Sequence, residues 1–272
     1  MPIDENGFLG KEAELSAGKI YEKHKDYFDF CYDVNQFAQK EKYKFEPSDN
    51  DGQKLVAILL FTRILNSTQA GVFLINRGFC IEGAAMVRIV FELLIYLKNC
   101  CTDKRFHIQY AQQDILKRRK RLNTVVNNYP DDSDFEKIKE YVNSGGLDEL
   151  NREIKRENIK ELPTKFDLAK KVGMKHDYDT VYRLNSDAIH PSIKSLEKYV
   201  LGEYGELKTI DSGPNDNDAE IHLCTFADYL LIAVHDVSIL FYNDIDPSFE
   251  TFRDRLNQLL DKYSETWKPS TP

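Results

Sequence analysis

Apolar side chains recur every three to four residues along most of the chain, which is the period of an α-helix. The sequence has no stretch of sustained apolar/polar alternation of the kind typical of strands. The spacing therefore predicts an all-α fold, a single multi-helix bundle domain of about nine to eleven helices. The expected helices span residues 11–42, 55–77, 81–101, 104–128, 134–142, 148–158, 163–172, 177–190, 192–201, 219–242 and 247–267.

Two segments depart from the helical pattern. Residues 45–52, FEPSDNDG, have the composition of a loop, and Asp51 is placed to cap the helix that follows. Residues 202–218 are rich in glycine, aspartate and asparagine, and a small β-hairpin is expected near residues 204–214. We expect residues 1–50 to form an N-terminal helix and loop that pack on a core domain made of residues 51–272.

The composition limits the function classes. The 272 residues include 37 Lys and Arg against 45 Asp and Glu, a net charge of −8, which argues against generic electrostatic binding to nucleic acid. No disulfide framework or zinc site is expected, because the cysteines are odd in number and lack a CxxC or Cys/His pattern. These five cysteines are Cys31, Cys80, Cys100, Cys101 and Cys224. No cofactor is expected either, and the chain contains no GxxxxGK(S/T) or GxGxxG motif.

The sequence also bears on location. The first residues carry acids and no apolar run, so no secretory signal is expected. The longest apolar tract, residues 84–97, contains Arg88 and Glu92 and is too short and too charged to span a bilayer. These features predict a cytoplasmic protein that does not contact a membrane.

The basic residues are concentrated in the middle of the chain. Between Lys98 and Lys175 there are 18 Lys and Arg against 13 Asp and Glu. The strongest run is KRRKR, which covers more than one turn of its helix, so its side chains cannot all face a core. It is either a solvated outer face or a patch that contacts phosphates, with RNA as the candidate ligand. The run comprises Lys117, Arg118, Arg119, Lys120 and Arg121.

Arg88 and Glu92 are the only charged residues in the apolar tract at residues 84–97. They lie four residues apart, on one helical face, and we expect both to be buried, which requires both to be paired. Removing one partner from a buried pair costs roughly 3–5 kcal/mol. Two interpretations remain open, an ion pair that fixes helix register and a functional pair.

A second polar cluster lies in YDTVYRLNSDAIHPS. Helical geometry places Arg183, Ser186 and His190 on one stripe, with Tyr182 beside Ser186 and Asp187 beside Arg183. We expect the Arg88 and Glu92 helix to meet this cluster. His190 ends its helix, where the dipole favours the protonated ring; it is either a C-terminal capping residue or an acid.

The segment from Arg183 to His190 is an Arg-x6-His element, which resembles the signature of the HEPN superfamily of helical-bundle proteins. A wider layout resembles an uncharacterised bacterial all-helical family that is often grouped near HEPN, over roughly residues 55–200. Its two motifs are an Arg-x3-Glu helix and a Tyr-x3-Ser-x3-His helix, here formed by Arg88, Glu92, Tyr182, Ser186 and His190.

The HEPN resemblance implies a metal-independent endoribonuclease of a toxin or antiviral defence system. His190 would then move protons during attack of a 2'-hydroxyl on the scissile phosphate, and Arg183 would stabilise the phosphorane. Tyr182 or Ser186 would orient the phosphate, and the KRRKR helix would hold the RNA backbone. The resemblance also implies a homodimer and a protein partner such as an antitoxin.

The sequence is equally compatible with a second class of protein. A non-catalytic helical interaction or sensor module would use Arg88, Glu92, Tyr182 and His190 as a structural polar core. The 15 tyrosines and 16 phenylalanines suit packing and interfaces as well as they suit a site. Sequence reasoning leaves both functions open.

Overall fold

The computed structural model describes residues 5–47, 50–186, 193–203 and 206–266 of the chain. The expected all-α class is confirmed, since helices α1 to α12 make up most of this part and ten of them have seven residues or more. The short 3₁₀ turns η1 (Gly7–Leu9), η2 (Ser133–Phe135) and η4 (Glu197–Tyr199) complete the helical elements, together with one π-helical turn.

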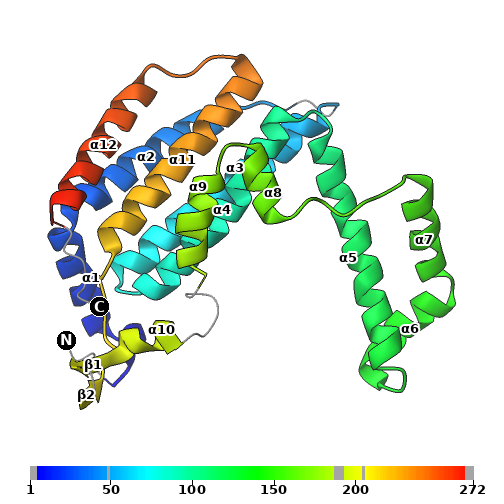
Figure 1. Cartoon of the computed structure of the whole chain (residues 1–272), viewed down its shortest axis with the longest axis horizontal. Helices are drawn as coiled ribbons and strands as arrows, with labels where there is room; N and C mark the ends of the chain where they lie inside the picture. The colour runs from blue at the N-terminus through cyan, green and yellow to red at the C-terminus, as the bar shows by residue number, and fades with distance from the viewer. Residues whose placement is uncertain (1–4, 48–49, 187–192, 204–205, 267–272) are drawn as a thin grey trace.

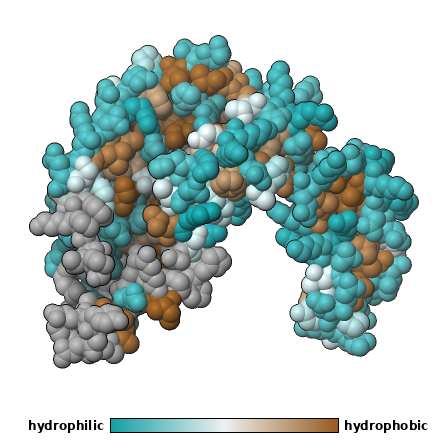
Figure 2. Space-filling view, in the orientation of Figure 1, coloured by the Kyte–Doolittle hydropathy of each residue, from teal (hydrophilic) through white to brown (hydrophobic). Residues whose placement is uncertain are grey.

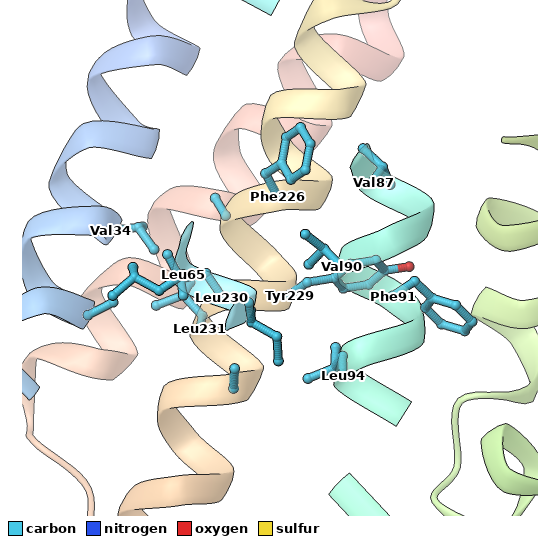
Figure 3. Packing of buried hydrophobic residues seen from close by; sticks show 14 of the residues in the cluster. Val34, Leu65, Val87, Val90, Phe91, Leu94, Phe226, Tyr229, Leu230 and Leu231 are labelled. Atoms are coloured by element: carbon cyan, nitrogen blue, oxygen red, sulfur yellow. The ribbon is translucent and has the colours of Figure 1, made fainter. Parts of the chain in front are cut away.

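Four helices form the centre of the bundle: α2 (Lys25–Lys42), α3 (Gly52–Asn76), α4 (Cys80–Thr102) and α11 (Ala219–Tyr242) (Figure 1). A tight turn connects α3 to α4, and these two helices pack along each other. Helix α11 packs against α2, α3 and α4. The turn needs Gly78 because its φ is +85° and an added Cβ would lie 2.5 Å from Pro214. Figure 3 shows the resulting core, in which α11 places Phe226, Tyr229 and Leu230 between its neighbours.

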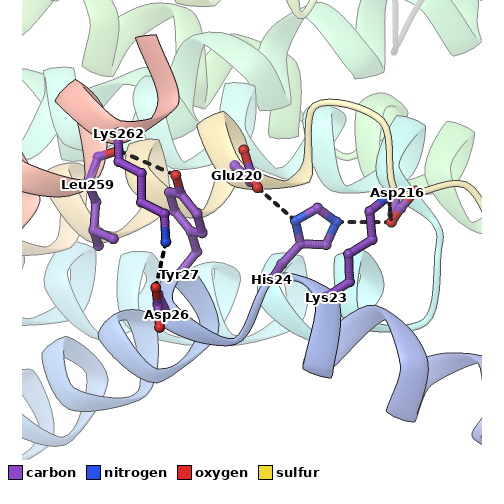
Figure 4. Close-up of polar contacts among 8 residues, drawn as sticks. All are labelled: Lys23, His24, Asp26, Tyr27, Asp216, Glu220, Leu259 and Lys262. Atoms are coloured by element: carbon purple, nitrogen blue, oxygen red, sulfur yellow. Dashed lines mark hydrogen bonds and ion pairs between the residues drawn. The ribbon is translucent and has the colours of Figure 1, made fainter. Parts of the chain in front are cut away.

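The prediction of a single helix at residues 11–42 is wrong, since α1 (Lys11–Lys23) ends before His24 and α2 begins after it. His24 leaves helical geometry with φ −114° and ψ 28°. Its ring contacts Asp216, on the loop that leads into α11, and Glu220, in the first turn of α11 (Figure 4). This tertiary contact accompanies a break that the helical period of the sequence does not reveal.

Helices α5 (Phe106–Asn128), α6 (Glu136–Asn143) and α7 (Gly146–Arg156) form an arm beside the bundle (Figure 1). Of the α5 residues only Phe106, at the base of the arm, is buried. The chain then returns to the bundle, where α8 (Lys165–Lys171) packs against α4. The molecule is therefore hollowed between the arm and the bundle (Figure 2).

The next segment differs from the expected helix at residues 177–190. Helix α9 (Lys175–Asp177) passes directly into the π-helical turn η3 (Tyr178–Tyr182), and a turn follows at residues 185–186. A π turn holds more residues than an α turn, so it changes the directions in which side chains on either side point. The remainder of the expected helix lies outside the described residues.

A small hairpin is present, slightly earlier than expected. Strand β1 (Val200–Glu203) pairs antiparallel with β2 (Glu206–Ile210). The helix expected at residues 192–201 is shorter, since α10 (Ile193–Leu196) continues only into η4 before β1 begins. Helix α12 (Ser248–Thr266) completes the described chain and packs along α11 and α2.

Two helices, α3 and α11, are long and apolar enough to cross a membrane by length and composition. Both lie at the centre of the bundle, where 50% and 61% of their apolar windows are buried. A bundle's core helices have the same length and composition, so these features are weak evidence for a membrane span.

Candidate nucleic-acid interface

A polar cluster joins α4 to η3. Arg88 and Glu92 lie one turn apart on α4 and both contact Tyr182, the last residue of η3. The Tyr182 hydroxyl accepts a hydrogen bond from Arg88 Nη2 at 2.9 Å and donates one to Glu92 Oε1 at 3.1 Å. The structure therefore contains the expected contact between these two segments.

Arg88 is the most deeply placed charge of the cluster, with 12% of its side chain exposed. Its guanidinium carbon lies 4.4 Å from the centre of the Tyr182 ring, and its Nε lies 3.5 Å from Glu92 Oε1. Within the described part of the chain, Nε and Nη1 are buried without forming a hydrogen bond. The expected burial is therefore only partial, since 26% of the Glu92 side chain is exposed. Glu92 is the carboxylate that compensates the deeper Arg88 cation.

Lys165 is a member of the cluster that sequence reasoning missed. Its ammonium lies 2.6 Å from Glu92 Oε1. Thr164 caps α8 by accepting from the Asp167 amide, and this cap fixes the start of the helix at Lys165. Burial works against the charged ammonium, but the hydrogen bond and charge of Glu92 outweigh it and raise the pKa of Lys165.

A cleft of about 720 Å³ begins at Lys165 and runs along α5. Its length on α5, from Tyr110 to Asn128, is about 27 Å at 1.5 Å per residue. Residues 161–165 and Tyr96 of α4 close one end. The cleft is lined by Tyr96, Tyr110, Gln113, Leu116, Lys117, Arg119, Lys120, Asn123, Thr124, Asn127, Asn128, Glu161, Leu162, Pro163, Thr164 and Lys165.

Three cations of the KRRKR run line this cleft, namely Lys117, Arg119 and Lys120. Together with Lys165 they face a single acidic lining residue, Glu161. None of the three forms an ion pair or side-chain hydrogen bond within the described chain, and Arg119 is half-buried. Many other cations are paired, as Lys25, Lys98 and Lys171 are with carboxylates at 2.5, 3.0 and 2.8 Å.

The other two residues of the run, Arg118 and Arg121, are exposed and do not line the cleft. The α-helical period explains the division, because five successive residues cover more than one turn. The run is therefore partly a solvated face and partly the wall of a concave surface. The solvated face describes Arg118 and Arg121, and phosphate contact by the other three residues stays a prediction.

Two tyrosines form the closed end of the cleft. The ring centres of Tyr96 and Tyr110 are 5.2 Å apart, and both rings also pack near Phe106. Burial raises the pKa of each phenol, so both hydroxyls stay neutral near pH 7. A polyanion entering here would meet cations along the wall and aromatic side chains at the end.

Two further expected site residues, Arg183 and Ser186, are described and do not join the polar cluster. Arg183 is 66% exposed and lies 3.7 Å from Asp179, with its guanidinium 5.9 Å from the Tyr178 ring centre. Ser186 donates its hydroxyl proton to the Tyr182 carbonyl at 2.8 Å. Asp187 and His190 lie outside the described residues.

All five cysteines are free thiols, four of them buried. Burial raises the pKa of Cys31, Cys100, Cys101 and Cys224, so these thiols remain protonated near neutral pH. In the described ranges no three His, Cys, Asp or Glu side chains come together in a way that could hold a metal ion.

These features define a mostly helical bundle with an arm, a half-buried polar cluster and a cleft lined by four cations. Three of these cations have no partner among the described residues. The chain belongs to the family of unknown function DUF5677, whose model matches residues 54–206. This range runs from α3 into β2, so it contains both the polar cluster and the whole cleft. The chain matches no curated protein and no solved structure.

Proposed function

We propose that the protein is a HEPN-like, metal-independent endoribonuclease that holds RNA in the cleft between α5 and residues 161–165. The observation that carries the proposal is the meeting of Lys117, Arg119, Lys120 and Lys165 in one concave surface of an otherwise acidic chain. Positive grooves combined with aromatic side chains are typical of proteins that track a single-stranded backbone.

Among the described residues the three α5 cations have no protein partner, and this supports the proposal. A cation that is already paired must give up its carboxylate before it can neutralise a phosphate, whereas Lys117, Arg119 and Lys120 need not. Lys165 differs, because it bridges the cleft and Glu92. Phosphate bound at Lys165 would therefore act directly on the cluster that holds Tyr182.

The proposed chemistry takes place near the segment that follows Tyr182. The 2'-oxygen attacks the adjacent phosphorus and loses its proton to a base, while the bond from phosphorus to the 5'-oxygen breaks and that oxygen gains a proton. The products are a cyclic phosphate and a free 5'-hydroxyl. We assign the proton transfers to His190 and stabilisation of the phosphorane charge to Arg183. This proposal places the protein in the cytoplasm, as a homodimer with a regulatory partner such as an antitoxin.

The test uses purified full-length protein and mixed cellular RNA in EDTA. We expect cleavage that leaves cyclic phosphate ends, and a loss of at least about a hundredfold in rate for Arg183→Ala and for His190→Ala. Lys11→Ala, at an exposed residue of α1, is the control and is expected to cleave normally. Cleavage that is insensitive to His190→Ala, or no cleavage by a folded wild type, contradicts the enzymatic proposal.

A second candidate function is a non-catalytic helical interaction or sensor module. The observation that favours it is the pairing of Arg183 with Asp179, which occupies the arginine that would otherwise meet a phosphate. In that case Arg88, Glu92, Tyr182 and Lys165 serve only to fix α8 and η3 on α4. The absence of cleavage in that assay, together with RNA binding in a separate gel-shift measurement that Arg183→Ala leaves unchanged, would favour this function.

A further inference from the structure

Amide side chains form a distinct part of the cleft wall. Gln113, Asn123, Asn127 and Asn128 all line it from α5. Gln113 is already used, because its amide nitrogen donates to the Lys160 carbonyl at 2.9 Å and its oxygen accepts from the Leu162 amide at 3.2 Å. This amide therefore holds residues 160–162 on α5 and fixes the shape of the cleft.

The three asparagines differ from Gln113 in their hydrogen bonding. None of them forms a side-chain hydrogen bond with the described residues, and Asn123 is half-buried. Each amide offers two donors and one acceptor. Asparagine also favours helix interiors less than alanine, glutamate or lysine does, so helix formation alone does not explain three of them within the last six residues of α5.

The asparagines stand next to the cations. Asn123 lies three residues after Lys120, and Asn127 lies one further turn along the same face. Lys120 and Asn127 are seven positions apart in the helix, which is about 10.5 Å along the axis. A phosphate held at Lys117 and Lys120 would bring its own nucleotide's base, or the next one, to the amides.

Amides suit the recognition of a base edge. Asparagine can pair with an adenine edge through one donor and one acceptor, and unpaired RNA bases expose their Watson–Crick and Hoogsteen edges. A base inside a duplex hides one of these edges. The combination of phosphate-binding cations and unpaired amides therefore suits a nucleotide whose base is not paired.

We propose that Asn123 and Asn127 select the base of an unpaired nucleotide whose phosphate is held by Lys117 and Lys120. This inference rests on the proposed binding of RNA in the cleft. It adds that the cleft discriminates between bases and that the substrate is a single-stranded segment of preferred sequence. The cations set the affinity, and the two amides set the preference.

The test measures binding of fluorescein-labelled 12-nucleotide homopolymers of U, A and C by fluorescence polarisation at fixed salt in EDTA. We expect the wild type to prefer one homopolymer by about fivefold to a hundredfold. The double variant Asn123→Ala with Asn127→Ala should bind the three with nearly equal affinity and keep the wild-type salt dependence. Gln112→Ala, on α5 outside the cleft lining, is the matched control and should keep the preference.

The outcomes separate the two proposals. Binding of all three homopolymers with equal affinity by the wild type, or a preference that survives in the double variant, overturns base selection and leaves RNA binding intact. A wild type that binds none of them overturns RNA binding and base selection together. Thermal melts of each variant confirm that the fold is retained, as expected for asparagine to alanine changes in a helix.

Discussion

The imidazole of His24 and the carboxylate of Asp216 are 2.9 Å apart, although 192 residues separate them in the chain (Figure 4). The second ring nitrogen lies 3.1 Å from Glu220, and Lys23 reaches the same Asp216 oxygen at 2.7 Å. A ring that donates to two carboxylates must carry both protons. The hydrogen bond to Asp216 outweighs burial and raises the pKa of His24, and the same bond lowers the pKa of Asp216.

This arrangement predicts a stability that falls as the pH rises. The unfolded histidine has a pKa near 6.5, so the raised pKa of folded His24 contributes stability fully below pH 6.5 and loses it as pH rises through the folded value. The lowered pKa of Asp216 makes its contribution fade only below about pH 4. Urea denaturation between pH 5.5 and 8.5 should show a decreasing free energy of unfolding, by about 2 kcal/mol at most.

His24→Gln should lower stability at pH 5.5 and flatten the pH dependence, because glutamine cannot gain the second proton. His176→Gln is the matched control, since His176 is exposed on α9. If both variants keep the wild-type slope, the His24 contact does not control stability in this range.

Glu92→Ala should destabilise the fold by about 3 kcal/mol, because it leaves Arg88 buried beside a second cation with no carboxylate. Glu92→Gln keeps an acceptor for the Tyr182 hydroxyl and should therefore lower the stability of the fold by less than Glu92→Ala does. Chemical denaturation with Glu22→Ala, an exposed carboxylate on α1, provides the comparison. Equal midpoints for Glu92→Ala and the wild type would contradict the role of Glu92 as counterion.

The sequence predicts those helices well whose apolar period is long and whose ends carry recognisable caps. Helix α11 has the expected bounds, and Asp51 caps α3 as expected by accepting from the Lys54 amide. The break at His24 and the π turn at Tyr178–Tyr182 could not be predicted in this way. Both involve contacts with distant segments, which override local periodicity.

The candidate site shows the same division. Two charges in an apolar stripe require partners, and this requirement correctly predicted that the Tyr182 segment contacts Arg88 and Glu92. No local pattern identifies Lys165 as the third partner of the cluster, because its position depends on how the chain returns from the arm. The sequence likewise could not tell which members of the KRRKR run line the cleft, since this depends on how α5 packs against α3, α4, α6 and α7.

Two glycine substitutions should have opposite effects on stability. A Cβ added at Gly71 of α3 would lie 2.1 Å from the Phe226 ring of α11, so Gly71→Ala should cost about 1–3 kcal/mol. A Cβ at Gly18 of α1 meets nothing within 4 Å, and Gly18→Ala should stabilise the fold by about 0.5–1 kcal/mol. Thermal melts measure both effects. An unchanged or higher melting temperature for Gly71→Ala would show that α3 and α11 are not packed as closely as described.

The salt dependence of RNA binding distinguishes the cleft from a general basic surface. Each cation that neutralises a phosphate of a single strand contributes about 0.7 to the slope of log affinity against log salt. Lys117→Ala with Lys120→Ala should therefore reduce the slope by about 1.4 and weaken binding of every homopolymer alike. Arg118→Ala with Arg121→Ala removes the same charge from the same turns of α5 but outside the cleft, and should leave the slope almost unchanged. Equal reductions by the two double variants would mean that RNA follows the net charge of α5 and does not enter the cleft.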